Sequence, residues 1–156
     1  MPSPQERPSA SDVAKYFLSL VDEDEGDFIS NLKLQKLLYY AQGIHLAMFN
    51  EPLFDEPIEA WAHGPVVRKV YDEYAGYGAN PIPRPSELNL KMLNKNMRNF
   101  LNEVYSVFGQ YDAWKLREMT HDEPPWKDTY KEGQGQNEPI SHVMMKNYFH
   151  QFVESK

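Results

Sequence analysis

Residues 32–49, with the sequence LKLQKLLYYAQGIHLAMF, set the strongest limit on how this chain folds. Their apolar side chains recur at the i, i+3, i+4 and i+7 spacing of an α-helix. The opposite side is mixed, because Tyr39 and Tyr40 stand there among lysines and glutamines. A helix with one apolar and one mixed face is typical of a helix packed between others. The stretch therefore predicts a central helix, with Asn31 as its N-cap.

The N-terminal half contains three further structural signals. Ser9 and Asp12 match a capping box, and the apolar stripe that follows predicts a first helix. Residues 58–62 alternate apolar and polar side chains, which predicts a short extended segment. Another helix is predicted to begin directly afterwards. Gly64 suits its N-cap, and Pro65 suits the first helical position, where the missing N–H costs nothing.

The C-terminal half predicts three more helices and one loop. Apolar residues recur with helical spacing over residues 90–108, and Asp112 suits the cap of a shorter helix. Residues 121–138 show no periodicity and are predicted to be a loop. Ser141 suits the cap of the last helix, on which Phe152 is expected to face inward.

These segments predict a mainly α-helical protein, a compact bundle of about six helices with one short extended element near residues 58–62. A chain of 156 residues, of which 41% are hydrophobic and 25% charged, suits one globular domain. We expect residues 1–8, which are polar and rich in proline, to form a disordered leader. The single domain is expected to span residues 9–156.

Charge and cysteine content limit the classes of partner. The formal net charge of −7 repels phosphate groups, so strong nucleic-acid binding is not expected. No segment approaches the roughly 18 apolar residues of a membrane helix, and no signal peptide is recognised, so no membrane partner is expected. The chain has no cysteine, which excludes disulfides and cysteine-based zinc sites and suits a cytoplasmic location.

The sequence carries no recognisable catalytic motif. It lacks the G-x-S-x-G nucleophile turn, a Gly-rich phosphate loop and the H-E-x-x-H metal motif. Its His121-Asp122-Glu123 segment has the H-x-E spacing of zinc deaminases, but the C-x-x-C that such a site needs is absent. We therefore predict a protein that is not an enzyme, without cofactor or metal. One alternative is a metal-dependent hydrolase that uses His63, His121 and Glu123, which requires these side chains to converge within a few ångströms.

Three short clusters combine polar and aromatic side chains in an unusual way. As framework, they would fill the core and tie loops to the backbone. As a binding surface, Trp, Tyr and His on stiff segments would supply contact area at a small cost in entropy. The sequence leaves both interpretations open. The candidate partner-binding residues are Lys36, Tyr39 and Tyr40 in the first cluster, His63, Gly64 and Pro65 in the second, and His121, Glu123 and Trp126 in the third.

Four segments occur in a characteristic order: KLQKLLYYAQG, EAWAHGPVV, THDEPPW and the Ile-Ser start of a last helix that bears Tyr-Phe. In this order they resemble the Panacea domain family, which includes SocA-like and phage-associated GepA-like proteins. The resemblance spans nearly the whole chain, from about Asp12 to Phe152.

The resemblance implies a small, mainly helical antitoxin of a toxin–antitoxin system, often encoded in a prophage beside its toxin gene. It also implies direct binding to a cognate protein toxin, whose identity no motif of the chain encodes. One branch of the family is thought to deliver its toxin to a cytoplasmic protease. A proteolytic adaptor that contacts a protease or its unfoldase is therefore an alternative. A homodimer also stays open, because spare aromatic surface could serve self-association.

Overall fold

Helix α2 (Asn31–Phe49) is the central element of the computed structural model, which describes residues 7–153. Side chains on all sides of α2 are buried, as expected for the predicted central helix. The predicted N-cap is wrong by one residue. The Ser30 hydroxyl accepts a 3.3 Å hydrogen bond from the Lys33 N–H. The Asn31 side chain instead donates to the carbonyl of Tyr71 and so joins two helices.

Between residues 7 and 153 the chain forms seven α-helices, four 3-10 turns and one two-stranded sheet. The mainly helical class is confirmed, with seven helices where the sequence predicts about six. No helix in this range is both long and apolar enough to cross a membrane. In chain order the elements are α1 (Ala10–Ser19), η2 (Glu23–Glu25), α2, β1 (Glu59–Trp61), β2 (Gly64–Val66), α3 (Arg68–Tyr74), η3 (Ala75–Tyr77), η4 (Leu90–Met92), α4 (Lys95–Phe108), α5 (Ala113–His121), α6 (Pro124–Tyr130), η5 (Lys131–Gly133) and α7 (His142–Val153).

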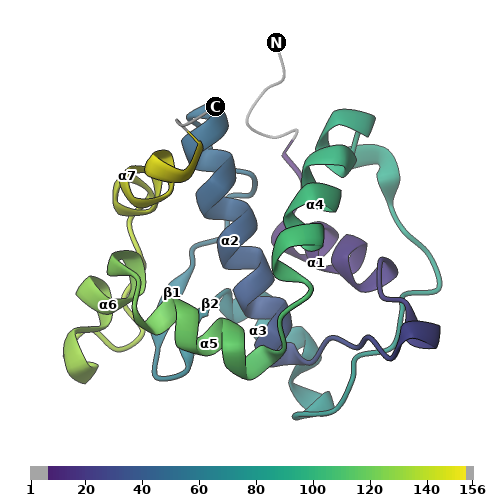
Figure 1. Ribbon diagram of the computed structural model, residues 1–156, viewed down its shortest axis with the longest axis horizontal. Coiled ribbons are helices and arrows are strands. Elements are labelled where there is room, and N and C mark those ends of the chain that lie inside the picture. Colours follow the sequence, from purple (N-terminus) through teal and green to yellow (C-terminus); the bar gives the residue numbers. More distant parts are fainter. Residues whose placement is uncertain (1–6, 154–156) are drawn as a thin grey trace.

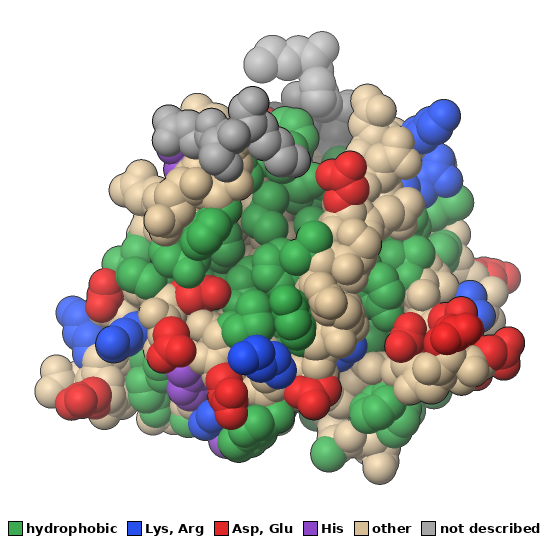
Figure 2. All heavy atoms as spheres, in the orientation of Figure 1, with side chains coloured by type: hydrophobic (Ala, Val, Ile, Leu, Met, Phe, Trp, Pro, Cys, Tyr) green, Lys and Arg blue, Asp and Glu red, His purple; other side chains and the backbone are tan. Residues whose placement is uncertain are grey.

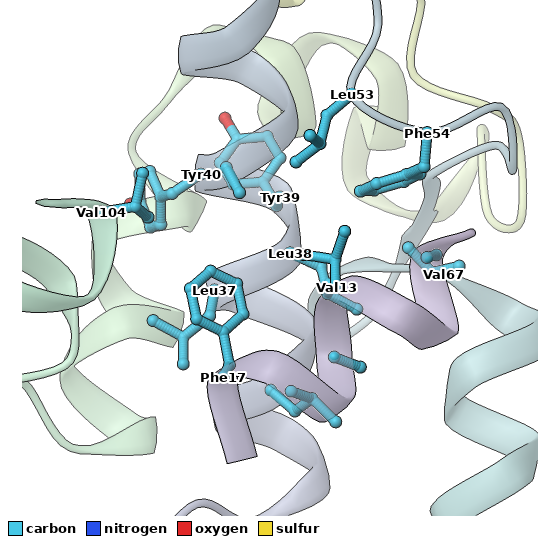
Figure 3. Close-up of a cluster of buried hydrophobic side chains, with 14 of the residues drawn as sticks. Val13, Phe17, Leu37, Leu38, Tyr39, Tyr40, Leu53, Phe54, Val67 and Val104 are labelled. Carbon is cyan, nitrogen blue, oxygen red and sulfur yellow. The ribbon is translucent and has the colours of Figure 1, made fainter. Parts of the chain in front are cut away.

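The other elements pack around α2, which contacts α1, α3, α4, α5, α7 and β2 (Figure 1). Figure 3 shows Leu37 and Leu38 of α2 beside Val13 and Phe17 of α1. All four side chains are fully buried. On another side, α7 packs along α2 and closes the core there. Because neighbours cover α2 on several sides, its polar residues are drawn into the interior together with the apolar ones.

The start of α1 confirms the predicted capping box. The Ser9 hydroxyl accepts a 3.0 Å hydrogen bond from the Asp12 N–H, and the Asp12 carboxylate accepts a 3.1 Å bond from the Ser9 N–H. Arg7, within the predicted leader of residues 1–8, donates a 3.2 Å hydrogen bond to Asp55. The first six residues of that leader lie outside the described part of the chain.

Residues 64–66 form a strand, so the prediction that a helix begins at Gly64 and Pro65 is wrong. Strand β2 pairs antiparallel with β1, and Trp61 lies opposite Gly64 across a tight turn. The φ angle of Gly64 is +113°, a conformation that glycine adopts far more easily than other residues. Helix α3 begins four residues later, at Arg68. A Gly-Pro pair suits a hairpin as well as a helix start, and local sequence did not distinguish the two.

Two other predicted boundaries differ from the structure. The predicted loop of residues 121–138 contains α6, which begins with Pro124 and Pro125. Proline is tolerated in the first turn because the N–H that it lacks would have no helical partner there. The helix predicted over residues 90–108 begins only after Asn94, whose side chain accepts a hydrogen bond in the first turn.

Candidate functional site

The Glu123 carboxylate joins α2 to the segment between α5 and α6. Its Oε1 accepts a 2.9 Å hydrogen bond from the Tyr39 hydroxyl, and its Oε2 accepts a 2.8 Å bond from the Tyr40 hydroxyl. Glu123 is only 8% exposed, and burial raises its pKa to about 7, although the two tyrosine hydrogen bonds act in the opposite direction. Among residues 7–153, no Lys or Arg forms an ion pair with it. The carboxylate is thus held by neutral donors alone.

Lys36 joins α2 to the β1–β2 hairpin. Its ammonium group is fully buried and donates a 3.1 Å hydrogen bond to the carbonyl of Pro65. Burial, together with the nearby charge of Arg117, lowers the pKa of Lys36 to about 7. A Cβ at Gly64 would lie 2.7 Å from Lys36 Cε and 3.0 Å from Thr120 Oγ1. Gly64 is therefore needed for the space that the lysine occupies as well as for the turn.

Trp126 and His121 form a stacked pair beside this hairpin. Their ring centroids lie 3.9 Å apart with an interplanar angle of 21°. The Trp126 indole N–H donates a 2.8 Å hydrogen bond to the carbonyl of Trp61, which ties α6 to β1. Burial, together with the charge of Arg117, lowers the pKa of His121 to about 4. The exposed His63 accepts a 3.2 Å hydrogen bond from the Arg117 Nε–H.

The structure gathers all three predicted clusters around one side of α2, but most of their residues lie in the interior. His63 is exposed and His121 is half-buried. The other predicted residues are buried: Lys36, Tyr39, Tyr40, Gly64, Pro65, Glu123 and Trp126. Direct contact of these residues with a partner stays a prediction. Their positions give them a framework role, in which they hold α2, the hairpin and the start of α6 together.

The structure does not bring together the ligands that the metal-dependent alternative requires. It requires His63, His121 and Glu123 to meet at one point. Among the described residues, no group of three or more His, Asp or Glu side chains could hold a metal ion. Glu123 is instead bonded to two tyrosines, and His63 to Arg117.

A groove with a volume of about 440 Å³ opens on the surface between α4 and α7, and α2 forms its floor. Figure 2 shows hydrophobic side chains gathered in this hollow. Met48, Val107 and Phe152 line the groove and are 47%, 49% and 57% exposed. Tyr40 and Glu123 also line it, so the groove reaches the buried tyrosine–carboxylate network. We call this feature the apolar groove.

The sequence did not reveal the apolar groove. Phe152 is predicted to face inward, and the structure contradicts this, since more than half of its side chain is exposed. A weak signal was present, because α2, α4 and α7 each end in adjacent apolar residues. Such pairs continue the apolar stripe past the part of each helix that the core can cover. The pairs are Met48–Phe49, Val107–Phe108 and Phe152–Val153.

Fold and site together define a small helical module in which a buried polar network supports an exposed apolar groove. The family model described as Antitoxin SocA-like, Panacea domain matches residues 34–127, which is more than half of the 156-residue chain. The chain belongs to this family. The matched region contains all nine predicted site residues, from Lys36 to Trp126, so the tyrosine–carboxylate network lies within the family domain.

One curated relative supports the assignment. The chain is 46% identical over 54 residues to Antitoxin SocA of Caulobacter vibrioides (strain NA1000 / CB15N). The alignment covers 35% of this chain and 29% of that protein, so the chain spans less than a third of the relative's length. No solved structure gives a significant match.

Proposed function

We propose that this chain is an antitoxin that neutralises a cognate protein toxin by direct contact, without a reaction of its own. Membership of the Antitoxin SocA-like family supports the proposal. The net charge of −7 favours a basic partner. The apolar groove carries the most weight, because a contiguous apolar hollow on a surface marks an interaction site.

Co-expression with the protein encoded beside this chain tests the proposal. We expect that protein alone to arrest growth, and this chain to restore growth when both are produced. The two proteins should also elute together from a size-exclusion column. Arrest that persists although this chain accumulates in folded form would contradict the antitoxin assignment.

Sequestration is the form of neutralisation that we propose. Delivery to a protease is a separate alternative. The half-life of the toxin distinguishes the two. Sequestration predicts rescue with an unchanged half-life, whereas a half-life that shortens only when this chain is present would indicate delivery.

A further inference from the structure

The apolar groove lies between two helices of the bundle, where one further helix could pack. In Figure 1, α4 and α7 lie on either side of α2, and α2 contacts both. Ile44 of α2 contributes to the floor, while Val107 of α4 and Phe152 of α7 contribute to the two walls. Packed helices lie about 8–10 Å apart, so one helix from another protein could bury both walls at once.

Both charged side chains that line the groove are carboxylates. Glu103 is exposed on α4, and Glu123 lies buried with its oxygens bonded to Tyr39 and Tyr40. A buried carboxylate without an opposite charge is costly. A cationic side chain that entered the groove would supply that charge at a carboxylate that is only 8% exposed. The groove is therefore complementary to a segment that is apolar and carries a positive charge.

From these observations we infer that the apolar groove receives an amphipathic helix of the toxin, with apolar side chains on Val107 and Phe152 and a Lys or Arg directed at Glu123. The inference rests on the proposed function, since it identifies the part of the toxin that is bound. A second copy of this chain is a poor occupant. Two copies would each bring a net charge of −7, and their grooves would bring carboxylates against carboxylates.

A matched pair of exposed valines tests the location. Val107 is 49% exposed in the groove wall, and Val143 is 68% exposed on α7 and does not line the groove. We expect Val107→Glu to weaken binding of the purified toxin by about tenfold or more, as found for central interface residues. Val143→Glu should leave the dissociation constant within about twofold of the wild-type value. Calorimetric titration measures both, and an unchanged urea midpoint shows that each variant is folded.

Synthetic helical peptides test whether a positive charge on the bound helix pairs with Glu123. One peptide of about 18 residues, or five helical turns, carries an apolar leucine face and one lysine at its edge, and its partner carries methionine instead of lysine. Wild-type protein should bind the lysine peptide about tenfold more tightly than the methionine peptide, because the lysine can pair with Glu123. Glu123→Gln should abolish this preference, so that it binds the two peptides with dissociation constants within about twofold of each other.

Several outcomes would overturn the inference. If Val107→Glu and Val143→Glu weaken toxin binding equally, the toxin does not bind in the groove. If Glu123→Gln still prefers the lysine peptide, the proposed ion pair with Glu123 does not form. A sedimentation coefficient of this chain alone that falls upon Val107→Glu would make a second copy the occupant. The two proposals fail separately. Wild-type protein that does not bind the toxin refutes the antitoxin assignment, whereas undiminished binding by Val107→Glu refutes only the groove.

Discussion

The hydroxyl of Tyr40 donates a 2.8 Å hydrogen bond to Oε2 of Glu123, a residue 83 positions later in the chain. The neighbouring Tyr39 donates a 2.9 Å bond to the other oxygen of the same carboxylate. One acidic side chain thus fixes α6 to the middle of α2, on the floor of the apolar groove. The groove therefore has a rigid base that the protein builds from its own polar residues.

Removal of this carboxylate should lower stability. Glu123→Ala leaves the buried Tyr39 and Tyr40 hydroxyls without their acceptor, and each unsatisfied buried donor costs about 1–3 kcal/mol. We expect the free energy of unfolding in urea to fall by about 3 kcal/mol. The control is Glu118→Ala, at an exposed position of α5, which should change it by no more than about 0.5 kcal/mol. Equal effects of the two substitutions would show that the network adds nothing to stability.

The central helix and the capped starts of α1 and α5 could be predicted from sequence because their signals are local. The 3.6-residue period over residues 32–49 shows which side chains share a face. The Ser9–Asp12 capping box and the cap at Asp112 involve residues three positions apart. Errors arose where one local pattern suits two structures, as with Gly64-Pro65. Hydrogen bonds from distant side chains decide that case, since Lys36 bonds to the Pro65 carbonyl.

The candidate site was only partly accessible to sequence reasoning. The unusual composition of three segments drew attention to Lys36, Tyr39 and Glu123. Tyr39 and Glu123 do meet in one network, whereas Lys36 bonds to the Pro65 carbonyl of the hairpin. Their burial was not predictable, because it depends on how α5 and α6 pack against α2. The apolar groove depends on the open space between α4 and α7, and no pattern within one helix encodes that distance. Exposed Val107 could not be told from a core valine.

A side chain at Gly64 should destabilise the hairpin. Gly64→Ala places a Cβ 2.7 Å from the Cε atom of buried Lys36, at a φ angle of +113° that disfavours alanine. We expect a loss of about 2 kcal/mol, or a melting temperature lower by roughly 5 °C. Gly76→Ala is the matched control, because a Cβ there meets nothing within 4 Å. If both variants have the melting temperature of the wild type, the Lys36 side chain can move to make room for the added Cβ.

The pH dependence of stability should report on Lys36. Its pKa in the folded protein is lowered from 10.5 to about 7, mainly by burial. Between these values the unfolded chain binds one more proton than the folded chain, so raising the pH stabilises the folded state. Above pH 7, the free energy of unfolding of the wild type should rise by up to about 1.4 kcal/mol per pH unit relative to that of Lys36→Met.

Urea titrations of both proteins at several pH values from 6 to 9.5 measure this difference. Below pH 7 the difference should be flat, because Lys36 is then protonated in both states. Lys127→Met, at an exposed position of α6, serves as the control for removal of a lysine. Parallel profiles of wild type and Lys36→Met across the whole range would show that the buried amine keeps its proton.

The Trp126 indole should stabilise the fold through both its ring and its N–H group. Trp126→Phe keeps an aromatic ring near His121 but removes the 2.8 Å hydrogen bond to the carbonyl of Trp61. Because that carbonyl is partly buried, we expect the free energy of unfolding to fall by about 1–2 kcal/mol. Trp126→Ala also removes the stacked ring and leaves a cavity, which should cost about 4 kcal/mol.

Trp114 provides the matched control for this prediction. Its side chain is 57% exposed on α5, so Trp114→Phe should change the free energy of unfolding by no more than about 0.5 kcal/mol. Circular dichroism at increasing urea concentration is the suitable measurement, since fluorescence would change with the number of tryptophans. Were Trp126→Phe as stable as Trp114→Phe, the bond to Trp61 would not hold α6 against β1. The attachment of α6 would then depend on Glu123 and its two tyrosines.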